Sequence, residues 1–430
     1  MKTRILMFGW EFPPHHSGGL GVACYGLTRA LKARGDEVIF VMPKSLPVGA
    51  PWAKFVFADA PEIRAGIRIG DLVTYAVSSR ISPYAWNGSY RSDASLDRGG
   101  GKAATVATML ASIDELYGWN LMAEVMRYAA SGAEIARREA FDVIYAHDWL
   151  GFGAGIEAKR ATGKPLIVHV HATEFDRCGG SQGVNPDVYA IEKAGMEAAD
   201  AVVAVSEFTK NLIVREYGIA PQKVHVVHNG IDAATLPQGK GTLPRLRQLK
   251  AAGFSLVLFL GRVTLQKGPD YFLRVARRVR EKNGKVMFVM SGSGDMQAQM
   301  MRLAAQLGIS DRVLFTGFVS GADRHEMYAS ADLFVMPSIS EPFGITTLEA
   351  MSLGTPVLLS KQSGVSEAVA HVLKADFWDI EDMADKILAV VGYTGLGASL
   401  SKNAAKEAEA LTWDKAAEKV DNLMAGLGVQ

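Results

Sequence analysis

The stretch PSISEPFGITTLEA, residues 337–350, follows a short apolar run of strand length and leads into a helix candidate. Glu341 and Glu349 lie eight positions apart, the first before the helix and the second inside it. The turn that ends at Gly344 places backbone N–H groups at a helix start, where an anion binds favourably. A helix-capping acid followed by a surface acid would also fit this pattern, but the added glycine favours a binding site.

Outward from this stretch, apolar strand candidates alternate with amphipathic helix candidates in two successive series. The first series of strands runs from Ile5–Phe8 to Lys223–Val227, and the second from Leu256–Leu260 to Pro356–Leu359. Apolar strands that alternate with helices are typical of parallel sheets covered on both faces. The pattern predicts an α/β fold with two doubly wound, Rossmann-like domains. Ligands of such sheets bind beyond the carboxyl ends of the strands, so we expect the domains to face a cleft.

A polar stretch with several Gly and Pro residues, Ala233–Gly253, separates the two series. This composition is typical of a domain boundary. We therefore expect an N-terminal domain at residues 1–240 and a C-terminal domain at residues 241–410. The segment 411–430 has apolar residues at helical spacing and predicts a closing helix. A segment rich in Ser, Gly, Asp and Arg at 87–102 predicts a loop of the first domain.

Length and composition limit the class of protein. The chain has 430 residues, of which 49% are hydrophobic and 21% charged, and its formal net charge is +1. This length favours two hydrophobic cores, and the balanced charge gives no sign of a nucleic-acid surface. Its two cysteines, Cys24 and Cys178, form no CxxC pair, which favours a cytoplasmic protein without a disulfide framework. No stretch approaches the ~18 apolar residues of an integral membrane segment. The oligomeric state is open.

Two loops after strand candidates carry groups suited to phosphate. Gly18 and Gly19 precede a helix, so backbone N–H groups there can approach an anion closely, although a tight turn also explains them. Arg262 and Lys267 lie in the loop after Leu256–Leu260, where two positive charges can neutralise a diphosphate. Either residue alone would fit a solvated turn, but the shared loop favours binding.

Weaker candidates also follow strands. His171 and Asp148 stand at strand ends in the first half, where a structural and a functional role are equally expected. Ser291 and Gly292 resemble a loop that approaches phosphate or sugar, and Phe318 is placed to flank a nucleobase. Ordinary strand–turn elements would explain these three as well.

Several reaction classes lack their signatures. The sequence has no Walker A motif, no HExxH, no GxSxG and no kinase signature. Its nearest approach to an acidic metal motif, Asp379–Asp382, is better explained as helix capping. We therefore predict no metal requirement.

Taken in order, these motifs resemble those of retaining GT-B glycosyltransferases over nearly the whole chain. Within that group the chain looks most similar to glycogen and starch synthases and to the large family 4. The segments that carry the resemblance are Gly18–Leu20, His147–Trp149, His171, His228–Asp232, Arg262 with Lys267, and Glu341 with Glu349. His16 stands where bacterial glycogen synthases carry Lys, and Glu349 where they carry Tyr, which is closer to family 4 and archaeal-type synthases.

The resemblance implies a role for each matching residue. Arg262 and Lys267 would stabilise the departing nucleotide diphosphate, and Glu341 would contact hydroxyls of the donor sugar. His171 would lie at the reacting sugar and Asp148 on the acceptor side. The closing helix would cross back to the first domain. The predicted donor-binding set comprises Gly18, Gly19, Ser291, Gly292, Phe318, Gly344, Ile345, Thr346 and Glu349, the last of these holding the ribose.

We expect a hexosyltransferase that moves glucose from ADP-glucose or UDP-glucose to the non-reducing end of an α-glucan, without a cofactor. A first alternative keeps the class but uses a lipid-linked, sugar-phosphate or small polyol acceptor. The remaining alternatives are a nucleotide-sugar epimerase and a catalytically inactive sugar-nucleotide-binding protein.

Overall fold

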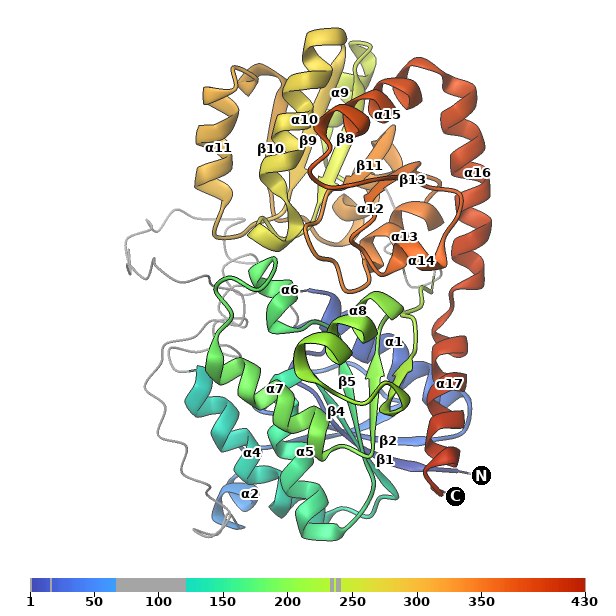
Figure 1. Cartoon of the computed structure of the whole chain (residues 1–430). Helices are drawn as coiled ribbons and strands as arrows, with labels where there is room; N and C mark the ends of the chain where they lie inside the picture. The colour runs from blue at the N-terminus through green and yellow to red at the C-terminus, as the bar shows by residue number, and fades with distance from the viewer. Residues whose placement is uncertain (1, 16–17, 67–120, 233–235, 237–240, 430) are drawn as a thin grey trace.

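The computed structural model describes residues 2–15, 18–66, 121–232, 236 and 241–429 (Figure 1). The predicted loop at 87–102 and the position of His16 lie outside the described residues. Two parallel sheets, with seven and six strands, form the centres of the two halves of the chain. The predicted fold class, two Rossmann-like domains, is confirmed.

The first sheet has the strand order β3-β2-β1-β4-β5-β6-β7. Its central strands are buried along nearly their whole length, because helices cover both faces. The strands are β1 (Arg4–Phe8), β2 (Glu37–Met42), β3 (Ala53–Phe57), β4 (Val143–His147), β5 (Leu166–Val170), β6 (Ala201–Ala204) and β7 (Val224–Val226). The α-helices are α1 (Gly19–Ala33), α2 (Pro61–Gly66), α4 (Leu121–Arg138), α5 (Asp148–Thr162), α6 (Glu174–Cys178), α7 (Pro186–Ala198) and α8 (Glu207–Leu212).

The second sheet has the strand order β10-β9-β8-β11-β12-β13. Its strands are β8 (Ser255–Leu260), β9 (Val286–Ser291), β10 (Val313–Gly317), β11 (Leu333–Met336), β12 (Val357–Ser360) and β13 (Leu373–Ala375). Its helices are α9 (Pro244–Ala251), α10 (Pro269–Lys282), α11 (Gln297–Gln306), α12 (Gly321–Ser330), α13 (Ile345–Ser352), α14 (Val365–Ala368), α15 (Ile380–Gly392) and α16 (Thr394–Ala410). In each sheet the strand order reverses next to a central strand, between β1 and β4 and between β8 and β11. Because all strands are parallel, the loops that follow them lie together at the carboxyl edge of the sheet.

Two edge strands were not predicted. Strand β3 is mostly half-buried, and β13 has only three residues, so neither shows the buried apolar run of a central strand. Helix α1 begins at Gly19, so this glycine is the first residue of the helix and does not precede it as expected. The interpretation of the acidic run as a cap is confirmed, because Asp379 Oδ1 accepts the Asp382 N–H at 3.0 Å.

The segment after α16 returns to the first domain. Helix α17 (Trp413–Gly426) packs against α1, and its side chains join the first hydrophobic core (Figure 1). A Cβ at Gly26 of α1 would overlap the Trp413 ring, so only glycine permits this packing. The Ile231 N–H donates to the Leu411 carbonyl at 2.8 Å, which joins the two segments that cross between the domains. The predicted boundary at 240 lies outside the described residues and stays a prediction.

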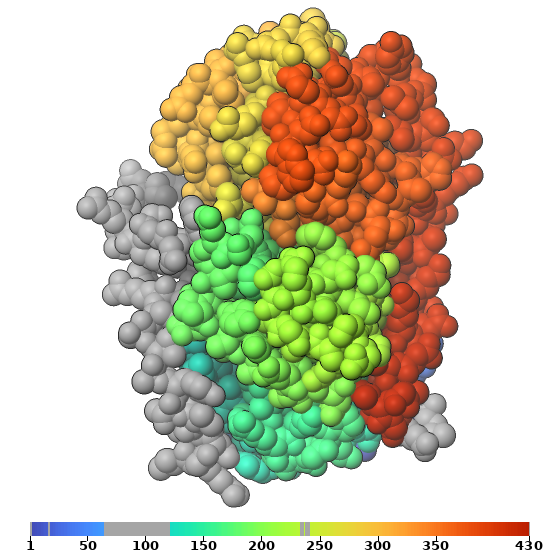
Figure 2. All heavy atoms as spheres, viewed as in Figure 1, coloured from blue at the N-terminus to red at the C-terminus, as the bar shows by residue number. Residues whose placement is uncertain are grey.

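The two domains touch along the middle of the molecule, as Figure 2 shows. Ser206 Oγ donates to the Pro342 carbonyl at 2.6 Å. The Glu367 carboxylate accepts the Glu207 N–H at 2.7 Å, so it lies at the start of α8. His228 Nε2 lies 2.7 Å from the same carboxylate. Within the described residues, no helix combines the length and apolar character needed to cross a bilayer.

Candidate active site

Asp148 organises the loop that follows β5. It is buried, and its φ of +52° is the only positive φ of a non-glycine residue in the described part of the chain. Its Oδ1 accepts the backbone N–H of His171 at 2.6 Å and that of Ala172 at 3.4 Å. Burial raises the pKa of Asp148 to about 7, and the nearby Arg177 opposes this shift. Asp148, predicted on the acceptor side, therefore contacts His171, predicted at the reacting sugar.

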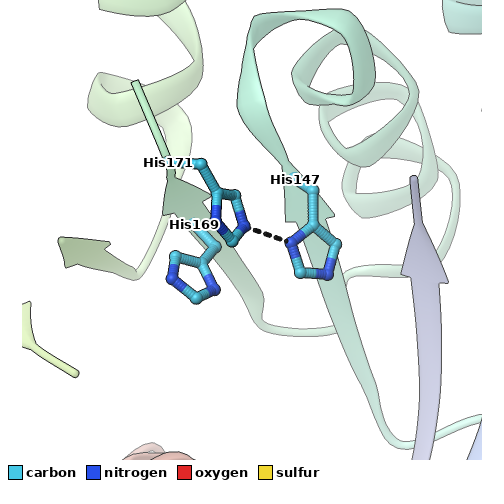
Figure 3. Close-up of side chains that lie close together, drawn as sticks. All are labelled: His147, His169 and His171. Atoms are coloured by element: carbon cyan, nitrogen blue, oxygen red, sulfur yellow. Dashed lines mark hydrogen bonds between the residues drawn. The ribbon is translucent and has the colours of Figure 1, made fainter. Parts of the chain in front are cut away.

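Three histidines cluster at the ends of β4 and β5 (Figure 3). His147 Nδ1 and His171 Nε2 are hydrogen-bonded at 2.8 Å. The His169 and His171 rings stack with centroids 4.0 Å apart, and Tyr145 Oη lies 2.9 Å from His169 Nδ1. Burial lowers the pKa of all three, that of His171 to about 3, so all are neutral imidazoles at neutral pH.

The same three side chains offer nitrogen atoms within 4.8 Å of one another, a spacing that could hold a metal ion. In the structure, however, His147 Nδ1 and His171 Nε2 are bonded to each other. A ring nitrogen that shares a proton in a hydrogen bond does not offer a free lone pair to a metal. The sequence-based expectation of no metal requirement stays a prediction.

A buried ionic network behind this loop was missed from the sequence. Arg177 Nε donates to Glu174 at 2.8 Å, and the same guanidinium pairs with Glu192, which also accepts the Tyr217 hydroxyl. Arg177 Nη1 donates to the Ala172 carbonyl at 3.1 Å, which fixes the loop after His171. Glu174 and Arg177 share α6 at i,i+3 spacing, but Glu192 and Tyr217 come from other elements, so only the fold reveals that these groups are buried together.

Lys267 and Glu341 form an ion pair at the carboxyl edge of the second sheet. Lys267 lies in a 3-10 turn after β8, and Glu341 follows β11 in a buried loop. Glu341 Oε2 also accepts the Ser338 hydroxyl at 3.3 Å, while its backbone N–H donates to the Gln362 carbonyl at 2.9 Å. Two of the three predicted catalytic charges of this domain therefore come together, held by the loops after three strands.

Gly344 sets the start of α13. Its φ of +107° favours glycine, and a Cβ there would lie 3.0 Å from Met336 Cε and 3.3 Å from Glu341 Cγ. No side chain caps this helix. The predicted contact residues Ile345 and Thr346 are its first two residues, so their N–H groups lie at its positive end.

Glu349 is buried inside α13. Its carboxylate accepts the Tyr328 hydroxyl at 2.9 Å and lies 3.4 Å from Arg324 Nη2. Both partners belong to α12, which sequence reasoning did not connect with this glutamate because no motif spans the two helices. Its role in holding a ribose stays a prediction.

The loops after β8 and β9 are packed tightly together. Gly292 has a φ of +135°, and a Cβ there would overlap the Gly261 carbonyl oxygen. Ser291 is fully buried, and its hydroxyl has no hydrogen-bond partner among the described residues. Phe318 follows β10 with 53% of its surface exposed. The predicted serine and glycine thus lie beside the Arg262 loop, whereas Phe318 lies at the surface.

Predicted residues of the two domains meet at the interface. Arg262 Nε is 3.9 Å from the position that a Cβ of Gly18 would take, and Ile345 Cδ1 is 3.8 Å from that of Gly19. Ser340 Oγ donates to Asp176 Oδ1 at 2.5 Å, which ties the Glu341 loop to the loop after His171. The side-chain hydrogen bonds of Glu349, by contrast, go to α12.

Comparison with known proteins shows the family to which this chain belongs. Residues 246–407 match glycosyl transferases group 1, and residues 118–235 match glycosyltransferase family 4. D-inositol 3-phosphate glycosyltransferase 1 of Catenulispora acidiphila is 31% identical over 66% of this chain and 71% of its own length. The chain belongs to the group 1 and family 4 glycosyltransferases. It is therefore a GT-B glycosyltransferase with group 1 and family 4 domains.

Other relatives of this glycosyltransferase span more of the chain. An uncharacterized glycosyltransferase of Methanocaldococcus jannaschii is 28% identical over 98% of this chain and 97% of its own. A glycogen synthase of Mycobacterium tuberculosis is 27% identical over 86% of this chain and 80% of its own.

Solved structures share the fold. Sucrose-phosphate synthase of Thermosynechococcus elongatus has a TM-score of 0.72 at 19% identity and covers 99% of both chains. HepE of Anabaena, solved with UDP and glucose, has a TM-score of 0.67 at 16% identity and covers 99% of this chain and all of its own.

Proposed function

We propose that the protein is a retaining hexosyltransferase that moves glucose from a nucleotide-glucose donor to the non-reducing end of an α-glucan. The observation that carries this proposal is the approach of the Gly18–Gly19 turn to Arg262 and Ile345. It brings together the start of α1, a guanidinium and the start of α13. Helix N-termini and a fixed positive charge together stabilise a diphosphate.

In the proposed reaction, the bond between sugar C1 and the phosphate oxygen breaks while an acceptor hydroxyl oxygen bonds to C1. The hydroxyl proton passes to the departing phosphate oxygen, so atoms and charge balance. Arg262 and Lys267 stabilise the charge that develops on the diphosphate. Glu341 accepts hydrogen bonds from sugar hydroxyls.

Retention is proposed because the acidic groups at the site are already bonded. Glu341 Oε2 is paired with Lys267 and Ser338, and Asp148 Oδ1 holds two backbone N–H groups. Neither resembles the free carboxylate nucleophile of a retaining hydrolase. Attack from the same face as the leaving phosphate retains the configuration without such a nucleophile.

The choice of donor and acceptor draws support from two relatives. HepE was solved with UDP and glucose, which favours a glucose donor. The glycogen synthase relative aligns with 86% of this chain, across both domains, which favours an α-glucan acceptor.

A second candidate is transfer to a phosphorylated polyol. The specific observation in its favour is the 31% identity to a D-inositol 3-phosphate glycosyltransferase. An inactive sugar-nucleotide-binding protein is disfavoured, because Arg262, Lys267 and Glu341 are all present and the last two are paired.

The test is nucleotide release from ADP-glucose, UDP-glucose and GDP-mannose, each alone, with glycogen and with D-inositol 3-phosphate. Glu341→Ala serves as the inactive blank, and Glu418→Ala, an exposed glutamate of α17, as the matched control. We expect glycogen to stimulate release from a glucose donor in the wild type and in the control. The linkage formed should be α, as shown by digestion with anomer-specific glucosidases or by NMR.

Other outcomes would redirect the assignment. Stimulation by inositol phosphate alone would establish the second candidate, and a β-linked product would refute retention. Conversion of the donor with no acceptor present would indicate an epimerase. Donor binding without turnover for every acceptor would indicate an inactive protein.

A further inference from the structure

Binding of the nucleotide-sugar or of the acceptor substrate does not explain why His147 and His171 are hydrogen-bonded to each other. His147 is fully buried at the end of β4, whereas His171 is only partly buried. Burial lowers the pKa of both side chains, so both are neutral near pH 7. In a bond between two neutral imidazoles, one ring donates its single proton and the other accepts it.

The surroundings of His147 decide which ring donates. Its Nε2 is buried and has no hydrogen-bond partner among the described residues. If the proton of His147 were on Nε2, a buried N–H would be left unpaired, which is rarer and costlier than an unpaired acceptor. The proton therefore belongs on Nδ1, which donates to His171 Nε2 at 2.8 Å. His171 must then carry its own proton on Nδ1.

We propose that His147 is a positioning residue that holds His171 in the Nδ1–H tautomer, so that His171 acts as a neutral hydrogen-bond donor at the sugar and not as a general base. Both nitrogens of His171 are committed in this state, because Nε2 accepts a bond and Nδ1 carries a proton. The His169 ring stacked at 4.0 Å and the Asp148 bond to the His171 backbone fix the same orientation. The inference rests on the proposed placement of His171 at the reacting sugar.

The first test compares His147→Asn with His147→Leu, two side chains of similar size. The Asn amide nitrogen takes nearly the position of His Nδ1 and can donate to His171, whereas Leu cannot donate. We expect His147→Asn to keep kcat within about threefold and His147→Leu to lose about 10- to 100-fold, with a smaller change in KM for the donor. Equal melting temperatures would show that both variants fold.

The second test reads the tautomer directly. In the full chain labelled with 15N-histidine, the ring 15N shifts of His171, assigned with His171→Gln, should show a proton on Nδ1. His147→Asp offers only an acceptor, so it should move that proton to Nε2. This measurement needs no activity and stands even if His147→Leu does not fold.

Three results would overturn the proposal. The first is a proton on Nε2 of His171 in the wild type. The second is a folded His147→Leu variant with the kcat of the wild type, together with an inactive His171→Leu variant. That result would show that His171 acts without being positioned by His147. The third is one equivalent of bound metal that is lost in His169→Leu, because the trio would then be a metal site. If His171→Leu keeps its activity, the placement of His171 in the proposed function is itself wrong.

Discussion

At the scale of single residues, Asp148 combines three unusual properties: burial, a positive φ and a raised pKa. A carboxyl whose pKa is higher in the folded than in the unfolded state binds an extra proton on folding between the two values. For Asp148 this window runs from its ordinary value of 3.8 to about 7. Protonated Asp148 therefore contributes to the stability of the folded state at low pH. This contribution is lost as the pH rises through the window.

Asp148→Asn tests this linkage. Asn keeps an oxygen acceptor for the two backbone N–H groups and tolerates positive φ, but it carries no charge. The free energy of unfolding of the wild type should fall relative to that of Asp148→Asn as the pH rises from about 4 to about 7, by at most about 1.4 kcal/mol per pH unit. Urea unfolding of both proteins across this range measures the difference. Glu192 and Arg177 are common to both, so a pH-independent difference would contradict the assignment to Asp148.

Residues of the site differ in how far the sequence predicts them. Lys267 and Glu341 each follow an apolar strand, and parallel strands bring their carboxyl ends to one edge, so their pairing is foreseeable. Arg177 and Glu192 lie in separate helices without a shared motif. What marks them is that two charges are buried together, and burial is a property of the fold.

At the scale of elements, the start of α13 depends on a single glycine. Gly344→Ala should lower the free energy of unfolding by about 1–3 kcal/mol, because alanine is strained at its φ of +107°. The added methyl would also press on Glu341 Cγ, so glycosyl transfer should fall by more than stability alone explains. Chemical unfolding and kcat, measured on the same preparation, check both effects.

Gly395→Ala is the matched control for this substitution. Gly395 lies in α16, with no atom within 4 Å of its Cβ position. Alanine there should leave the protein unchanged or about 0.5–1 kcal/mol more stable. Equal losses in both variants would refute the assignment of strain to Gly344.

Elements were predictable where both faces are covered. The buried strands β1, β4 and β5 are mostly apolar, and their alternation with helices predicted a parallel sheet. The edge strands β3 and β13 are half-buried or short, so their side chains follow no single pattern.

At the scale of the whole molecule, one hydrogen bond links the two halves of the site. Asp176 is fully buried, and burial raises its pKa while the Ser340 hydroxyl opposes that shift. Ser340→Ala should cost about 1–3 kcal/mol in unfolding free energy, because the carboxylate loses a donor. It should also lower kcat/KM, since this bond ties the Glu341 loop to the His171 loop. Ser399→Ala, at an exposed position of α16, should change neither quantity.

Because α17 packs on α1, substitutions in α17 should lower the unfolding free energy more than substitutions at exposed positions. Trp413 is 8% exposed, whereas Trp378 is 56% exposed. Trp413→Ala should lower the unfolding free energy by about 3–5 kcal/mol, and Trp378→Ala by less than about 0.5 kcal/mol. Hydrogen exchange should locate the first loss of protection in α1. Similar losses in both variants would show that α17 contributes little to the first domain.

The return of α17 also fixes an order of events during translation. Domains generally fold as they leave the ribosome, beginning from the N-terminus. Here the first domain cannot complete its core at that stage, because α17 is translated only after the entire second domain. Until then the nascent first domain leaves uncovered the surface of α1 that later packs against α17, where Trp413 lies over Gly26. The second domain is thus free to fold while its neighbour is still unfinished, and a chaperone would find its binding surface on α1.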